Sequence, residues 1–191
     1  MRTKRMRLLA SLCGSLALAA AASAEAADWR VDPARSTLTV EVDQGGKPLT
    51  GRFERFGAEI RFDPVGLADS RVVVTVDLAS FETGDPQRDQ IATSHEFLGA
   101  AAQPQARYET RSFKALGGDR YEVAAELSLK GVTKPLVHPV TIAIRGGEAR
   151  ATGEVVLTRT DFGVGARQFP HGDQVGLEVR VRFDLAATRQ G

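Results

Sequence analysis

The chain is poor in cysteine, with a single one, Cys13, among its 191 residues. Cys13 lies in the apolar stretch of residues 8–22, which follows a basic start and ends in Ala22-Ser23-Ala24. This arrangement is typical of a secretory signal peptide, so we predict that residues 1–24 are removed on export. The mature chain, residues 25–191, would then contain no cysteine, which excludes disulfide bonds and a cysteine nucleophile. Its fold must therefore be stabilised by core burial alone.

Beyond residue 24, no part of the chain concentrates charge of one sign. The whole chain has 25 Lys and Arg against 24 Asp and Glu, and removal of residues 1–24 leaves 21 against 24. Basic and acidic residues alternate, as in Arg52, Glu54 and Arg55. A nucleic-acid-binding surface requires a concentrated basic face. We therefore predict a salt-bridged, solvated surface and no nucleic-acid partner.

Long apolar runs and catalytic motifs are also missing beyond residue 24. No stretch there is apolar for long enough to span a bilayer, so we predict that the mature chain does not cross a membrane. The chain has no G-x-S-x-G, P-loop, G-x-G-x-x-G or H-E-x-x-H motif. Its three histidines, His95, His138 and His171, fall on different elements without metal-ligand spacing. We predict no metal site, no catalytic residues and no enzyme activity.

The chain is rich in alternation between apolar and polar residues, which predicts β-strands. The sequence of residues 127–140, LSLKGVTKPLVHPV, predicts two strands that join at Lys130-Gly131. One short helix is predicted within residues 83–98, where Asp85 is a good N-cap and Pro86 takes the first helical position. We predict an all-β fold of about eight antiparallel strands with one short helix. Closure into a barrel with an apolar interior would remove the sheet edges, although a flat sandwich would show the same alternation.

One histidine interrupts the apolar pattern. His138 takes a position that the alternation assigns to the buried face. It is interpreted as a core histidine with a hydrogen-bond partner, as a ligand contact, or as the general acid–base of an enzyme. Pro135 and Pro139 on the same strand cannot donate to a β-ladder, which predicts an edge, a bulge or a loose start there.

An arginine near the end of a later strand has two interpretations. Arg159 shares its phase with Val155 and Leu157, which would point its guanidinium at the mouth of the barrel. It forms either a salt bridge with Asp161 or the helix, or a contact with a ligand headgroup.

Four ordered motifs resemble those of the YceI-like family. They are G-x-F-x-x-F-x-A-x-I-x-F-D-P from Gly51, T-G-x-x-x-R-D from Thr83, L-x-L-x-G-V-T-K-P from Leu127 and L-x-R-x-D-F-G-V-G from Leu157. The resemblance extends over nearly all of the mature chain. It departs from the family at His138, where relatives have an aliphatic residue, and at Arg35, where they commonly have histidine.

This resemblance implies a lipocalin-like barrel that holds an isoprenoid lipid or a fatty-acid-like chain, with no required cofactor. The family is secreted by bacteria, so the predicted location is the periplasm. Some relatives are associated with membrane di-haem cytochromes of b type, which suggests a quinone as the isoprenoid and such a cytochrome as a partner.

The leading hypothesis is thus a periplasmic carrier for a polyprenol or quinone-like lipid. The alternatives are a small enzyme acting on a lipid inside the barrel and a structural barrel with a filled interior. The helix and the loop of residues 160–173 are expected to gate the cavity. The predicted ligand-binding residues are Val40, Phe62, Val74, Tyr108, Leu127, Leu129, His138, Val140, Val155, Arg159, Val179 and Val181.

Overall fold

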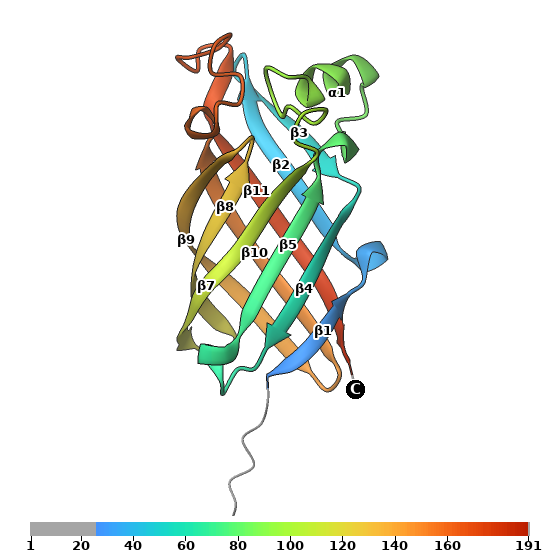
Figure 1. Ribbon diagram of the computed structural model, residues 1–191, viewed down its shortest axis with the longest axis vertical. Helices are drawn as coiled ribbons and strands as arrows, with labels where there is room; N and C mark the ends of the chain where they lie inside the picture. The colour runs from blue at the N-terminus through green and yellow to red at the C-terminus, as the bar shows by residue number, and fades with distance from the viewer. Residues whose placement is uncertain (1–25, 191) are drawn as a thin grey trace, which may run out of the picture.

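The computed structural model describes residues 26–190, so the predicted signal peptide lies outside the described residues. Within these residues the chain forms eleven strands and one α-helix, α1 (Pro86–Thr93) (Figure 1). The strands are β1 (Ala27–Val31), β2 (Thr37–Gln44), β3 (Lys47–Phe53), β4 (Phe56–Phe62), β5 (Arg71–Asp77), β6 (Phe81–Glu82), β7 (Gln105–Gly117), β8 (Arg120–Leu129), β9 (Val132–Arg145), β10 (Glu148–Thr158) and β11 (Val175–Arg189).

Eight of these strands close into an antiparallel ring in the order β1-β4-β5-β7-β8-β9-β10-β11. The ring closes because β1 pairs with β4 on one side and with β11 on the other, from Trp29 opposite Arg189 to Val31 opposite Ala187. The predicted barrel is therefore confirmed, and a flat sandwich is excluded.

Two of the long wall strands are interrupted where the sequence predicts breaks. Pro33 separates two strand candidates, and Phe53 is out of phase with the apolar residues that follow it, which predicts a bulge between Phe53 and Gly57. β1 and β2 are separated at Pro33, where a short 3-10 turn begins, yet both pair with β11. β3 and β4 are separated at Glu54 and Arg55, within the segment predicted to bulge. β2, β3 and the two-residue β6 extend the wall beside α1.

The helix lies at one end of the barrel, which is the upper end in Figure 1, together with the loop that precedes β11. Its start follows the prediction, because the Asp85 side chain accepts hydrogen bonds from the backbone N–H groups of Gln87 (2.9 Å) and Arg88 (3.4 Å). Pro86 occupies the first turn, where a missing N–H costs nothing. None of the helices within residues 26–190 is long and apolar enough to cross a membrane.

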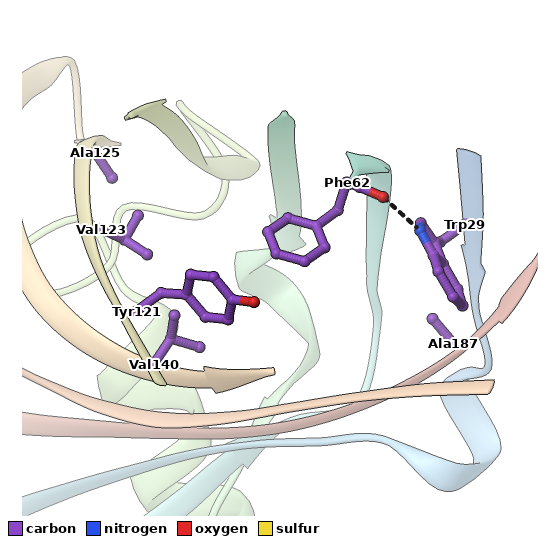
Figure 2. Close-up of a cluster of buried hydrophobic side chains, with 7 residues drawn as sticks. All are labelled: Trp29, Phe62, Tyr121, Val123, Ala125, Val140 and Ala187. Carbon is purple, nitrogen blue, oxygen red and sulfur yellow. Dashed lines mark hydrogen bonds between the residues drawn. The ribbon is translucent and has the colours of Figure 1, made fainter. Parts of the chain in front are cut away.

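The opposite end of the barrel is filled by large side chains (Figure 2). The Phe62 ring packs edge-on against the rings of Tyr121 (centroids 5.4 Å apart) and Phe113 (5.3 Å). The Trp29 indole N–H donates to the Phe62 carbonyl at 3.1 Å. We call this cluster the plug. Its buried members are Trp29, Phe62, Tyr121, Val123, Ala125, Val140 and Ala187.

The upper half of the barrel is different, because its inward-facing side chains are only partly buried. Apolar side chains that point inward yet remain partly exposed border space that the protein does not fill. We call this space the chamber. It lies between the plug and α1, and the side chains of its wall are Val40, Val42, Leu127, Leu129, Leu136, Val155, Leu157, Val179 and Val181.

Candidate functional site

One wall of the chamber is built from aligned aliphatic rows. Val181 of β11 stands opposite Val155 of β10 and Val40 of β2. The next row places Val179 opposite Leu157 and Val42 in the same way. Because cross-strand partners point to the same side of a sheet, these rows form one apolar surface. The predicted residues Val40, Val155, Val179 and Val181 thus lie together on it.

The facing wall carries a second row of predicted residues. Tyr108 of β7 stands opposite Leu127 of β8 and Val74 of β5. Val74 and Leu129 also pack against a second buried cluster, formed by Val76, Leu78, Ala100 and Ala106, which seats the segment after α1 on the barrel rim.

Two of the predicted ligand contacts lie in the plug. Phe62 and Val140 are 3% and 7% exposed, and both belong to the cluster of Trp29 and Tyr121. Phe62 lies beneath the chamber, whereas Val140 also lines the cavity between β9 and β10 that is described below. Alternation distinguishes the two faces of a strand, but it carries no information on depth along the barrel.

His138 lies at the level between chamber and plug, with a complete set of hydrogen bonds. Its Nδ1 is 3.1 Å from the Pro139 carbonyl and its Nε2 is 2.7 Å from the Tyr108 hydroxyl. A carbonyl can only accept, so Nδ1 carries the proton and Nε2 accepts from Tyr108. Burial lowers the pKa of the imidazole and raises that of the Tyr108 hydroxyl. Both side chains are therefore neutral and satisfied.

Arg159 is buried at the end of β10, in the short 3-10 turn Arg159–Phe162, and organises the following loop. Its Nε donates to the Gly176 carbonyl (2.8 Å) and its Nη1 to the Val164 carbonyl (2.9 Å), while Nη2 contacts two further carbonyls. Burial lowers the pKa of this guanidinium. The structure thus assigns the side chain to backbone carbonyls, and neither a salt bridge with Asp161 nor one with the helix occurs among the described contacts.

The upper end of the chamber is closed by two segments, residues 83–104 and 159–174, which we call the cap. The Gly165 N–H donates to the Glu96 carbonyl at 2.8 Å, and the rings of Phe97 and Phe169 lie 6.1 Å apart. The Lys130 ammonium donates to the carbonyls of His95, Glu96 and Gly163 at 3.0–3.2 Å. The two segments predicted to gate the chamber are therefore tied together.

The barrel wall is open between β9 and β10. Pairing runs from the hairpin turn as far as Val140 opposite Gly153, and within residues 26–190 no further pair joins the two strands. A cavity of about 570 Å³ lies at this gap. Its lining includes inward residues (Leu136, His138 and Val155) and outward residues (Val137, Pro139 and Val156). The cavity therefore connects the interior with the outer surface.

Three residues of the chamber wall, Val42, Leu136 and Leu157, were not among the predicted contacts. All three share the phase of predicted neighbours on their strands, so the alternation could have identified them. Gly153 leaves room for the Phe183 ring, because a Cβ built there would lie 2.4 Å from Cζ of that ring. A glycine inside a strand is a signal of such a close approach. In the part of the chain that the structure describes, no group of three or more His, Cys, Asp or Glu could hold a metal.

Comparison with known proteins identifies the family of this barrel. A family model for the YceI-like domain matches residues 29–187, which run from Trp29 within β1 to Ala187 within β11. The chain belongs to the YceI-like family. It is 30% identical to a UPF0312 protein of Pseudomonas paraeruginosa and 32% identical to one of Azotobacter vinelandii. Each alignment spans 184 residues, 92% of this chain and 96% of the relative.

Solved structures share the architecture of this YceI-like chain. The crystal structure of BcnA from Burkholderia cenocepacia is 31% identical, with a TM-score of 0.80, over 83% of this chain and 99% of BcnA. A polyisoprenoid binding domain from Saccharophagus degradans, implicated in plant cell wall breakdown, is 17% identical. Its TM-score is 0.71, over 86% of this chain and 99% of that domain, and it shows the shared fold.

The hydrogen bond between Tyr108 and His138 in this YceI-like barrel leads to a first prediction, on the stability of variants at these two residues. His138→Leu should lower the free energy of unfolding by about 1–3 kcal/mol, because it leaves the buried Tyr108 hydroxyl without its acceptor. Tyr108→Phe should also destabilise, since it leaves Nε2 without a donor. The double variant removes both partners and should lose less than the sum of the single losses in chemical denaturation. Strictly additive losses would show that the hydrogen bond does not stabilise the fold.

If His138 instead anchors a ligand headgroup, His138→Leu should keep its stability and bind polar-headed ligands about tenfold more weakly.

The same histidine makes the stability of the barrel depend on pH. Burial lowers the pKa of His138, so below its ordinary value of about 6.5 the unfolded chain binds a proton that the folded chain does not. The free energy of unfolding should therefore be highest above that pH and should fall as the pH is lowered through it. The free energy of unfolding of His138→Leu should fall less steeply over the same pH range. Equal slopes in the two proteins would contradict the burial of a neutral imidazole.

Proposed function

We propose that this YceI-like chain binds one long isoprenoid lipid, a polyprenol or a quinone-like molecule, in the chamber. The observation that carries the proposal is the contrast within the barrel. The lower half is filled by the plug, whereas the upper half keeps inward-facing Val and Leu side chains that are only partly buried. The alternative of a filled barrel thus describes the lower half alone.

The chemistry of the chamber suits a hydrocarbon chain with one polar end. Its walls are aliphatic, and the polar side chains at its floor, Tyr108 and His138, are hydrogen-bonded to each other. Affinity would come from burial of the chain, at about 25 cal/mol per Å² of apolar surface before the entropy cost of ordering it. A quinone carbonyl or prenol hydroxyl could exchange hydrogen bonds with the Tyr108 hydroxyl at that floor.

Binding rather than catalysis is supported by the contacts of His138, the residue that the enzyme alternative requires. Both ring nitrogens are occupied, one by the Pro139 carbonyl and the other by the Tyr108 hydroxyl. A general base is normally oriented by a carboxylate or a comparable partner and keeps one nitrogen for the substrate. The polyisoprenoid binding domain from Saccharophagus degradans, which shares the fold, supports the same choice of ligand.

The proposal also concerns the cellular location of the protein, which we expect to be the periplasm. Export through the predicted signal peptide would bring the barrel to the periplasm, where an apolar chain needs a carrier between membranes. A quinone carrier would exchange its cargo with a membrane redox protein, and the di-haem cytochrome of b type suggested by the resemblance is such a protein.

Displacement of a fluorescent fatty acid tests the proposal. The purified mature chain is loaded with cis-parinaric acid and then titrated with geranylgeraniol, decylubiquinone or palmitate. The proposal expects the prenol and the quinone to displace the probe at lower concentration than palmitate. A barrel that takes up neither the probe nor either isoprenoid would overturn it.

A further inference from the structure

The gap between β9 and β10 has a cause in the sequence. The Ile142 N–H donates to the Asp119 carbonyl beside β8 at 2.7 Å, so even-numbered residues of β9 turn their backbone groups toward β8. Backbone direction alternates along a strand, so the odd-numbered residues face β10. Pro135 and Pro139 are among them, and neither has an N–H to donate. The ladder ends at Val140, immediately before Pro139 is reached.

The gap is bounded at both ends. Below it, the ladder from Val140 opposite Gly153 to the hairpin turn holds the strands together. Above it, the Lys130 ammonium ties the turn between β8 and β9 to the Gly163 carbonyl, a few residues after β10 ends. The gap is therefore a window with fixed ends, rather than a frayed sheet edge.

Other routes into the chamber are obstructed. The lower end of the barrel is occupied by the plug, and the upper end is covered by the cap, whose two segments are joined through Glu96 and Lys130. The window needs no such rearrangement, since its cavity of about 570 Å³ already reaches Leu136 and Val155 on the inner face.

Most of the outer rim of the window is apolar, and the exposed Arg120 is the one Arg or Lys side chain among the residues that line its cavity. Five large hydrophobic side chains among the described residues are markedly exposed, and three of them, Leu116 (42%), Val137 (68%) and Val156 (47%), line this cavity. We call these three the collar. Glu154 lies on the same edge, but its carboxylate is drawn to Arg180 and Arg182 on β11, each at 2.8 Å. The missing N–H groups of the two prolines make the β9 edge still less polar.

We propose that the window between β9 and β10 is the side port through which the hydrocarbon chain of the ligand passes into the chamber. The inference rests on the proposed function, since it assigns a route to the same lipid. The collar receives the chain from outside, and the chain then slides between the strands past Val155 and Leu136. The cap stays closed during this exchange.

A reversible lock across the window tests this route. Val137 and Val156 would stand opposite each other if the ladder continued beyond Val140 and Gly153. The double variant Val137→Cys/Val156→Cys can be closed by oxidation, or by bismaleimidoethane where the gap is wide, and the sequence beyond Cys13 offers no competing thiol. The matched control is Ala143→Cys/Arg150→Cys, a pair on the same two strands within the intact ladder whose residues do not line the cavity. Stopped-flow fluorescence measures the uptake of cis-parinaric acid.

The locked window should slow uptake about tenfold or more relative to the same protein after reduction, or before bridging. The locked control pair should take up the probe at the rate of the unmodified chain, and both variants should melt as cooperative folds. Equal uptake by the locked and open forms would overturn the side port while leaving the proposed function intact. Failure of the unmodified chain to take up the probe or geranylgeraniol would overturn both.

Discussion

Val181→Trp is expected to weaken lipid binding about a hundredfold while leaving the barrel as stable as before. Val181 lies in the middle of the chamber wall, between Val155 and Val40, and all three side chains are only partly buried. An indole there would occupy the space proposed for the ligand. Excluding about 100 Å² of ligand surface removes about 2.5 kcal/mol of binding free energy. This loss weakens binding by about two orders of magnitude.

The measurement pairs thermal melting with cis-parinaric acid titration. Val65→Trp is the matched control, because Val65 is 86% exposed in the turn after β4. It should bind the probe as the unmodified chain does. A filled barrel makes the opposite prediction for Val181→Trp, since overpacking a complete core costs about 1–3 kcal/mol. A variant that melts lower and binds normally would place the ligand elsewhere.

Phe62→Ala is expected to have the largest effect on stability. Phe62 is 3% exposed, and its ring packs between those of Phe113 and Tyr121. Truncation of such a ring costs about 3–5 kcal/mol, because the surrounding side chains close the cavity only in part. Domains of this size are stable by about 5–15 kcal/mol, so the variant loses a large share of its stability.

Chemical denaturation measures this loss, with Phe81→Ala as the control. Phe81 is a half-buried ring on β6 that packs against Phe53 at 5.2 Å, outside the plug, and its truncation should cost less. The ligand affinity of folded Phe62→Ala should stay near that of the unmodified chain. If the free energy of unfolding fell by less than about 1 kcal/mol and ligand binding weakened, Phe62 would be a ligand contact rather than a member of the plug.

Much of the fold could be predicted from the sequence, because each barrel strand appears as a local alternation of apolar and polar residues. Alternation identified the wall strands, Pro33 marked the break between β1 and β2, and Asp85-Pro86 marked the start of α1. The turn at Lys130-Gly131 was also found, and both residues have positive φ there (50° and 75°). Closure was favoured by the argument that a barrel removes the edges of its sheet, although alternation alone left a flat sandwich open.

The site was harder to predict because its decisive contacts join distant residues. Tyr108 and His138 are 30 positions apart, and no local pattern pairs them. The carbonyls that hold Arg159 come from a loop whose path only the folded chain defines. Alternation separates two faces of a strand but gives no depth, so Phe62 and Val181 looked alike in the sequence.

The window shows an intermediate case. Pro135 and Pro139 predicted an edge or a bulge in their strand, and β9 does have an open edge there. The sequence does not say whether the prolines interrupt the pairing of β9 with β8 or with β10. The hydrogen bond from the Ile142 N–H to the Asp119 carbonyl beside β8 shows that the odd-numbered residues, including both prolines, face β10. The exposure of Val137 and Val156 on either side then follows from the register of β9 and β10.

The central claim, that the chamber holds a lipid, is tested most directly by native mass spectrometry of freshly purified protein. Organic extraction of the same sample would identify what is released. The account predicts a complex heavier than the mature chain by the mass of one isoprenoid lipid, which is lost on extraction and regained with added prenol or quinone. Protein that is always empty, and that takes up neither compound, would contradict it.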